Sequence, residues 1–183
     1  MKAELKPRIN LEGRTALQEV IPLAEPFVLF VDPSSACNFR CSFCPTGHSE
    51  LIADTGRYQG VMKYELFCKI IDDLADFDQP IKVLRLYKDG EPLLNKNLAK
   101  MIAYANKSGF VDYIDTTTNG SLMSPKRMAP IIEAGLDKIN ISVDGMSNKQ
   151  YKEFTGFNFD FGKFVSNVQW LEANKNNCEI VIK

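Results

Sequence analysis

Short apolar runs alternate with segments of helical spacing from residue 27 to the end of the chain. The run 27–31 is apolar throughout, as in a strand that is buried on both faces. Further strand-like runs cover 81–87, 111–117, 138–143 and 178–182. Helix-like segments cover 62–77 and 95–108, a third runs from Ser124 to Gly135, and Asp160 caps a fourth. This order predicts an α/β fold with a parallel sheet and right-handed crossovers.

The chain of 183 residues is long enough for one domain with a hydrophobic core. Residues 1–26 contain Pro7, Pro22 and Pro26 and are interpreted as a lead-in segment, and residues 27–183 as the core domain. The last predicted strand forms just as the chain stops. Because an open sheet edge is prone to misassociation, we expect the natural protein to be longer.

Composition and charge narrow the class of protein. Hydrophobic residues make up 45% and charged residues 25%, which is ordinary for a globular protein. The formal net charge of −1 comes without a basic run, so no nucleic-acid partner is expected. No apolar stretch approaches the length of a membrane span, and residues 1–10 do not form a secretory signal. We therefore expect no membrane contact and a cytoplasmic location.

Three of the five cysteines, Cys37, Cys41 and Cys44, fall within eight residues directly after the first predicted strand. An odd number of cysteines in a reducing compartment does not suit a disulfide framework. Three thiolates in one loop suit a [4Fe–4S] cluster, which normally has four cysteine ligands. The missing ligand leaves one iron open, and an open position is typical of a catalytic metal rather than a structural one.

Two simpler interpretations of the cluster stay open at this point. His48, the only histidine, could complete a structural zinc site with the three cysteines. Alternatively, the three cysteines are unrelated and buried, as free cysteines often are. Cys68 and Cys178 lie on a predicted helix and at the start of a predicted strand, so both are interpreted as core residues, with an auxiliary redox role as the alternative.

The CxxxCxxC spacing, with the aromatic Phe43 before the last cysteine, resembles the signature of the radical SAM superfamily. Three further motifs occur in the order that this family has them. They are Asp89-Gly90-Glu91-Pro92, Thr118-Asn119-Gly120 and Ser142-Val143-Asp144-Gly145. The first comes after a predicted strand and the other two each end one, and the carboxyl ends of parallel strands form the active site of a (βα) barrel. The resemblance covers about residues 27–182 and implies a partial barrel of about four and a half βα units.

The resemblance also implies roles for individual residues. Cys37, Cys41 and Cys44 would ligate three irons, and S-adenosylmethionine would chelate the fourth. Gly90 and Glu91 would receive the ammonium group of its methionine part. The remaining candidates for contacts with this cofactor are the backbone near Phe43, the side chain of Asn119, and Ser142 and Asp144.

By this resemblance the chain would be an enzyme that cleaves S-adenosylmethionine reductively to a 5′-deoxyadenosyl radical, which then abstracts hydrogen from a substrate. The expected partners are a small-molecule or peptide substrate and an external electron donor of the flavodoxin or ferredoxin type. The continuation after Cys44 resembles members with a C-terminal auxiliary-cluster domain of the SPASM type. A non-catalytic metal-binding module, with zinc or an inert cluster, is the alternative, and an incomplete barrel without activity is a third hypothesis.

The sequence departs from the family pattern at two positions. Asp89 stands where the family usually has glycine, although Asp tolerates unusual backbone conformations better than most residues. Many relatives pair an arginine after the fourth strand with the cofactor carboxylate, and this chain offers only Lys152 there, a poorer bidentate partner. Arg85 and Tyr87 are expected either to point into the barrel lumen or to serve packing.

Overall fold

A computed structural model of the chain describes residues 4–5, 7 and 15–183. Part of the predicted lead-in segment, residues 1–3, 6 and 8–14, lies outside this description. The described part contains a five-stranded parallel sheet in the order β1-β2-β3-β4-β5. The strands are Val28–Phe30 (β1), Val83–Arg85 (β2), Ile114–Thr118 (β3), Lys138–Ile141 (β4) and Glu179–Ile182 (β5). Strand order follows chain order, so the predicted parallel α/β fold is confirmed.

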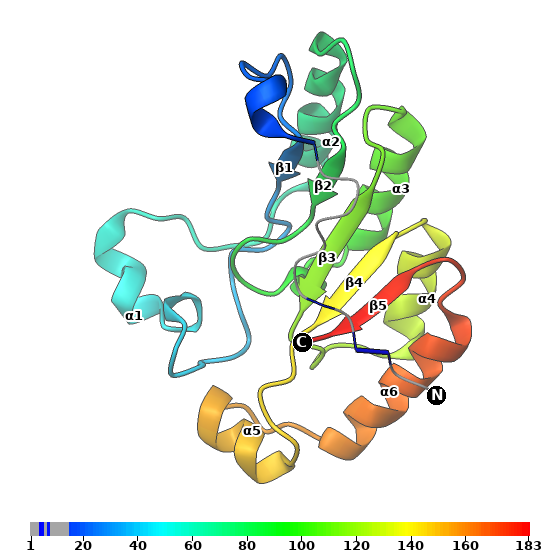
Figure 1. Ribbon diagram of the computed structural model, residues 1–183. Coiled ribbons are helices and arrows are strands. Elements are labelled where there is room, and N and C mark those ends of the chain that lie inside the picture. The colour runs from blue at the N-terminus through cyan, green and yellow to red at the C-terminus, as the bar shows by residue number, and fades with distance from the viewer. Residues whose placement is uncertain (1–3, 6, 8–14) are drawn as a thin grey trace.

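The longer helices lie on one side of the sheet (Figure 1). They are Tyr64–Asp72 (α2), Leu98–Ser108 (α3), Pro125–Glu133 (α4) and Phe161–Asn174 (α6). Each packs on the next, α2 on α3, α3 on α4 and α4 on α6. The helix layer therefore follows the strand order, as successive right-handed crossovers require. The sheet does not close on itself within the described residues, which agrees with a partial barrel.

Several short elements complete the fold. Two short α-helices are Ser49–Ile52 (α1) and Asn148–Thr155 (α5). The 3₁₀ turns are Leu17–Glu19 (η1), Pro45–Gly47 (η2), Ala53–Thr55 (η3), Asp73–Asp76 (η4) and Pro92–Leu94 (η5). The α1 segment projects to the left of the sheet in Figure 1, and α5 lies below it. Both flank the end of the sheet at which the strands finish.

The strand side chains divide cleanly between two faces. Leu84, Ile114 and Ile139 are fully buried beneath the helices. Their neighbours in sequence, Arg85, Asp115 and Lys138, carry charge and share the opposite face, because successive strand residues point to opposite sides. The apolar face forms the core with the helices, and the polar face is the inner surface of the partial barrel.

Some predicted boundaries were wrong in detail. The helix predicted over 62–77 starts at Tyr64 and tightens into the η4 turn after Asp72, as helix ends often do. The strand predicted over 138–143 ends at Ile141, so Ser142 and Asp144 lie just beyond it. The sequence analysis predicted neither α1 nor α5. No described helix is long and apolar enough to cross a membrane.

Candidate functional site

The three clustered cysteines lie in one tight loop between β1 and α1. All three are free and half-buried. The Cys44 N–H donates to the Cys41 carbonyl oxygen at 3.1 Å, which curls the loop around its second cysteine. A Cβ at Gly47 would overlap the backbone of Phe39, so the returning chain passes too close for any other residue. The loop is thus folded back on itself with its thiols held as neighbours.

Burial governs the protonation of these thiols. It raises the pKa of Cys37, and it raises the pKa of Cys41 to about 12. Asp144 and the two other thiols raise the pKa of Cys41 further by electrostatic repulsion. The metal-free loop therefore keeps Cys41 protonated at neutral pH, and a metal must displace its proton on binding.

The arrangement fits a cluster better than a single metal ion. Among the described residues, no three His, Cys, Asp or Glu side chains converge closely enough to hold one ion, as a zinc site requires. Thiolates that ligate a [4Fe–4S] cluster bind different irons and need not converge. His48 is engaged elsewhere, because its Nε2 lies 3.1 Å from the Cys41 carbonyl oxygen and its Nδ1 lies 3.5 Å from a Glu50 carboxylate oxygen. The zinc alternative is therefore not favoured.

The loop after β2 packs against the residues just before Cys37. Gly90 has a φ of +74°, and a Cβ there would overlap the carbonyl oxygens of Ser34 and Ala36. The Glu91 N–H donates to the Ala36 carbonyl oxygen at 2.8 Å. Asp89, the departure from the family glycine, is not among the described residues with positive φ, so the aspartate meets no backbone strain. This loop fixes the position of the first cysteine.

Glu91 is a buried clamp between two of the motif loops. Its Oε1 accepts hydrogen bonds from the Leu93 N–H at 2.9 Å and the Thr118 hydroxyl at 2.7 Å. Its Oε2 accepts one from the Asn119 N–H at 2.8 Å. Burial raises the pKa of Glu91, while these donors and Arg127 oppose the rise. The carboxylate thus ties β2 to β3, and its predicted contact with a methionine ammonium stays a prediction.

Asn119, at the end of β3, reaches the cysteine loop directly. Its Nδ2 lies 3.8 Å from the Cys37 sulfur and donates to the Asn38 Oδ1 at 3.0 Å. Ser121 closes the network, since its N–H and hydroxyl both donate to Asn119 Oδ1 and its hydroxyl accepts from Asn38 Nδ2. The third predicted motif is therefore in contact with the first.

The segment after β4 covers the other side of the cysteine loop. Asp144 is half-buried near Cys41, and burial raises the pKa of its carboxyl. The carbonyl oxygens of Phe154 and Thr155, at the end of α5, accept the N–H groups of Ser42 and Arg40. These contacts of α5 with the loop were missed in the sequence analysis, although a Ser147 cap and a Gly156 stop mark the helix.

Three of the remaining sequence candidates lie apart from the buried contacts. Phe43 is 68% exposed, and the predicted contact of its backbone with adenine stays a prediction. Ser142 is half-buried, and its N–H donates to the Thr118 carbonyl oxygen at 2.9 Å. Lys152 donates to the Gly156 carbonyl oxygen at 3.1 Å at the end of its own helix.

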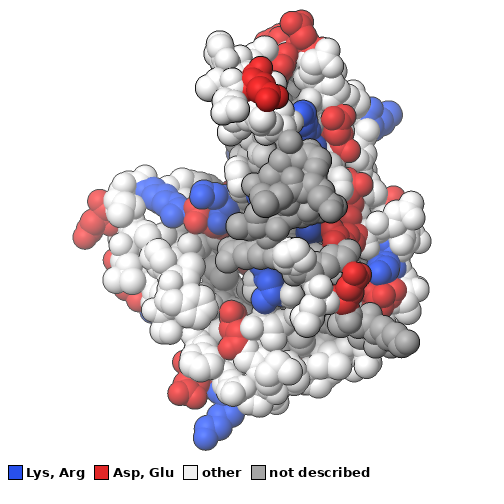
Figure 2. Space-filling model, in the orientation of Figure 1, with Lys and Arg blue, Asp and Glu red and all other residues white. Residues whose placement is uncertain are grey.

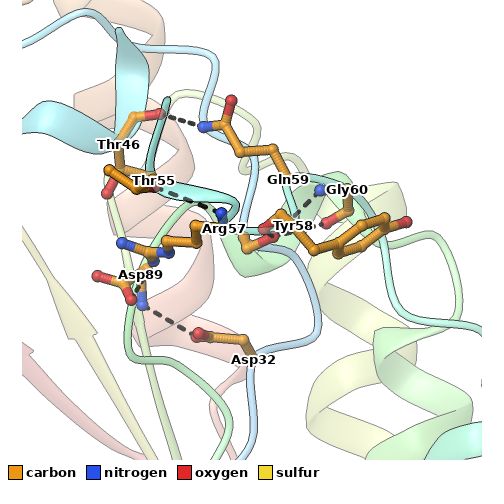
Figure 3. Close-up of polar contacts among 9 residues, drawn as sticks. Asp32, Thr46, Thr55, Arg57, Tyr58, Gln59, Gly60 and Asp89 are labelled. Atoms are coloured by element: carbon orange, nitrogen blue, oxygen red, sulfur yellow. Dashed lines mark hydrogen bonds and ion pairs between the residues drawn. The ribbon is translucent and has the colours of Figure 1, made fainter. Parts of the chain in front are cut away.

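An ion pair between Arg57 and Asp89 joins the segment after the cysteines to the loop after β2 (Figure 3). The Asp89 N–H also donates to Asp32 Oδ1 at 2.9 Å, which adds the end of β1. Gln59 donates to the Thr46 carbonyl oxygen at 2.9 Å, so the same segment is held to the residues that follow Cys44. Asp32 and Arg57 were not candidates in the sequence analysis, because no motif contains them.

The chain is similar to known proteins over the region that contains these motifs. The family profile described as the Radical SAM superfamily matches residues 31–182. Among curated proteins, the tungsten-containing aldehyde ferredoxin oxidoreductase cofactor-modifying protein of Pyrococcus furiosus is 30% identical over 122 residues. That alignment covers 67% of this chain and 32% of the relative. A probable GTP 3′,8-cyclase of Methanothermobacter marburgensis is 30% identical over 151 residues, covering 82% of this chain and 42% of the relative.

Two solved structures share the fold at lower identity. BtrN in complex with AdoMet and 2-DOIA superposes with a TM-score of 0.62 at 22% identity, over 86% of this chain and 57% of that chain. The structure of anSMEcpe with bound AdoMet gives a TM-score of 0.66 at 22% identity, over 86% of this chain and 42% of that chain.

The chain spans 32% of the length of the first of these curated relatives and 42% of the second. The family match itself covers most of the chain, and the five strands and all four motifs lie within it or at its edge. The chain therefore belongs to the radical SAM superfamily, and the [4Fe–4S] cluster and S-adenosylmethionine predicted from its cysteine motif are the cofactors of that family.

Proposed function

We propose that this chain cleaves S-adenosylmethionine reductively at a [4Fe–4S] cluster bound by Cys37, Cys41 and Cys44. The observation that carries the proposal is that three neighbouring half-buried thiols share one loop, which the ends of β2 and β3 contact through Glu91 and Asn119. The bound cluster would supply an electron and one open iron. The protein's own part is to orient its ligands and to exclude side reactions.

The end of the sheet offers acceptors for the cofactor's donor groups. Asp144 is a half-buried carboxylate whose charge acts on Cys41, and in this proposal it accepts ribose hydroxyls or the methionine ammonium. Ser142 precedes it by two residues and is half-buried as well. The backbone of Gly90 and of Phe43 supplies further contacts in this proposal. Glu91 acts mainly by fixing that backbone, because its carboxylate already accepts three hydrogen bonds.

The substrate is proposed from the relatives' names. Curated relatives include several GTP 3′,8-cyclases and a cofactor-modifying protein. We therefore propose that the substrate is a small molecule rather than a peptide. The flavodoxin- or ferredoxin-type donor, the cytoplasmic location and the SPASM-type domain stay predictions.

On the face seen in Figure 2, basic and acidic side chains are interspersed among the described residues.

Product analysis after anaerobic reconstitution tests the function. Protein loaded with iron and sulfide should hold about four irons per chain. With reductant and S-adenosylmethionine it should then release 5′-deoxyadenosine and methionine in equal amounts. Cys37→Ser, Cys41→Ser and Cys44→Ser should each abolish both the cluster and the product. Cys68→Ala and Cys178→Ala are matched controls that should keep both. Stoichiometric zinc in place of iron, or fully loaded protein without product, would refute the proposal.

A further inference from the structure

A row of three paired residues crosses the inner face of the sheet. Phe30 on β1 pairs in register with Arg85 on β2, and Arg85 pairs with Asp115 on β3. All three point away from the helices, because their neighbours Leu84 and Ile114 are fully buried beneath them. Tyr87 continues the same face one step further along the chain. We call Phe30, Arg85, Tyr87, Lys88 and Asp115 the lumen patch.

Asp115 holds the guanidinium of Arg85 from one side. The Arg85 Nε lies 3.3 Å from Asp115 Oδ2, and Asp115 is only 4% exposed. The Arg85 side chain is 37% exposed, so the rest of its fork faces the open side of the sheet. The other carboxylate oxygen, Asp115 Oδ1, is buried without a hydrogen-bond partner among the described residues. The buried Arg85 Nε likewise has no hydrogen-bond partner among the described residues, so the two side chains form an ion pair without a hydrogen bond.

Further cations gather over the two rings of the patch. The Arg85 Cζ and the Lys88 Nζ lie 5.6 Å and 5.7 Å from the centroid of Phe30. The rings of Phe30 and Tyr87 meet edge to face at 6.1 Å, and the Lys183 Nζ lies 5.7 Å from the Tyr87 centroid. A ring face attracts a cation without neutralising it. In the described part of the chain no carboxylate forms an ion pair with Lys88.

The patch lies beside the strand ends that carry the cofactor motifs. Tyr87 precedes Asp89 by two residues, and Phe30 precedes Asp32 by two. Of the two acids at that end, Asp89 pairs with Arg57, and Asp32 accepts a hydrogen bond from the Asp89 N–H. A molecule bound on the patch would therefore lie next to the proposed site of S-adenosylmethionine and meet the cations of Arg85 and Lys88.

We propose that the lumen patch binds a phosphate group of the substrate, with Arg85 and Lys88 as its ligands and Asp115 as the positioning residue for Arg85. This substrate class rests on the proposed function. A phosphate suits the patch better than a carboxylate, because it carries up to two charges and three acceptor oxygens for cations that come from different directions.

Equilibrium binding to the reconstituted chain, loaded with S-adenosylmethionine and kept anaerobic, tests the proposal. The probes are pyrophosphate, GTP and guanosine, which has the ring and hydroxyls of GTP without its charge. Pyrophosphate and GTP should bind, and guanosine should bind at least about tenfold more weakly. Arg85→Gln and Lys88→Gln should each weaken GTP binding by about tenfold. Lys107→Gln, on the exposed side of α3, is the matched control and should change nothing.

Two further variants protect the test against simple unfolding. Arg85→Gln leaves Asp115 buried without its cation, so the double variant Arg85→Gln with Asp115→Asn removes the pair without a lone charge. It should also lose pyrophosphate binding. Asp115→Asn alone keeps the Arg85 charge and should weaken binding by only a few fold, with an unchanged salt dependence, because the same number of cations meets the anion. Circular dichroism and iron content show whether each variant is folded.

The outcomes separate this inference from the proposed function. If the wild-type chain binds neither anion, or if Lys88→Gln and the double variant bind as well as the wild type, the lumen patch is not a phosphate site. If the anions bind as expected but no 5′-deoxyadenosine forms, the patch is a phosphate site and the proposed catalysis fails. If the product forms and no anion binds, catalysis stands and this inference fails alone.

Discussion

The guanidinium of Arg57 pairs with the carboxylate of Asp89, so the segment that follows the cysteine loop is tied to the loop after β2 (Figure 3). Both side chains are about one-third exposed, at 36% and 33%. Water screens such a pair, so its energy is modest, on the order of 1 kcal/mol or less. Its effect is expected on cofactor binding, because Asp89 adjoins Gly90, a proposed contact of S-adenosylmethionine.

Removal of either partner should weaken S-adenosylmethionine binding more than it destabilises the fold. We expect Asp89→Asn and Arg57→Gln each to raise the dissociation constant about two- to fivefold, measured by calorimetry on the reconstituted protein. The charge swap Arg57→Asp with Asp89→Arg should recover part of the loss, because a double-mutant cycle isolates the pair energy. If the dissociation constant of the swapped protein rises by as much as the two single changes combined, the pair has no such role.

Glu91→Gln should destabilise the chain by about 1–3 kcal/mol, the cost of a buried donor left without an acceptor. The wild-type carboxylate accepts three hydrogen bonds, whereas a glutamine must turn its NH₂ group toward at least one of the same donors. Urea unfolding of the metal-free protein measures the change. The matched control is Glu133→Gln at the exposed end of α4, which should change stability by less than about 0.5 kcal/mol.

The regular part of the fold could be predicted because its signals are local. The Ser124 side chain accepts the Arg127 N–H, and Asp160 accepts the Lys163 N–H, as the capping pattern predicted. Gly109 ends α3 with a φ of +73°. Each of these contacts spans three residues or fewer, so hydrophobic spacing and cap residues were enough to place the helices and the strands between them.

The parts that sequence analysis missed depend on distant partners. Helix α5 buries only Tyr151 and Thr155. It is held in place by the stacking of Tyr151 on Phe159, whose ring centroids lie 3.8 Å apart, and by its contacts with the cysteine loop. Glu91 meets Thr118 and Asn119 across 27 and 28 positions of the chain. Since no local pattern encodes such pairs, the motifs predicted which residues gather at the strand ends but not how Glu91 locks them.

Cys178 should make the stability of the metal-free chain depend on pH above 9. Burial is the main cause that raises the pKa of its thiol from 9.0 to about 11. Between these values the unfolded chain loses the proton first, so stability is full below pH 9 and falls as pH rises toward 11. Urea unfolding should show a loss of about 1 kcal/mol between pH 8 and pH 10 from this group. Cys178→Ala should have a flatter profile over this window, and an equal slope in both proteins would contradict the assignment.

Asn119 should set the reduction potential of the cluster through its contact with Cys37. Its Nδ2 lies 3.8 Å from the Cys37 sulfur and is oriented by Asn38 and Ser121. Hydrogen bonds to ligand sulfurs stabilise the extra negative charge of a reduced cluster. Asn119→Ala removes the donor, so the potential should move to more negative values by an amount on the order of tens of millivolts. Redox titration followed by electron paramagnetic resonance measures the shift.

The comparison of three variants separates this electronic effect from a structural one. Asn119→Asp keeps the shape but replaces the donor with a negative charge, so its potential should lie below that of Asn119→Ala. Asn106→Ala removes an exposed asparagine that donates to the carbonyl oxygens of Ala134 and Gly135, far from the cysteine loop in sequence. It should leave the potential unchanged. If the alanine and aspartate variants at position 119 keep both iron content and potential, the contact with Cys37 does not tune the cluster, and Asn119 serves only to close the loop.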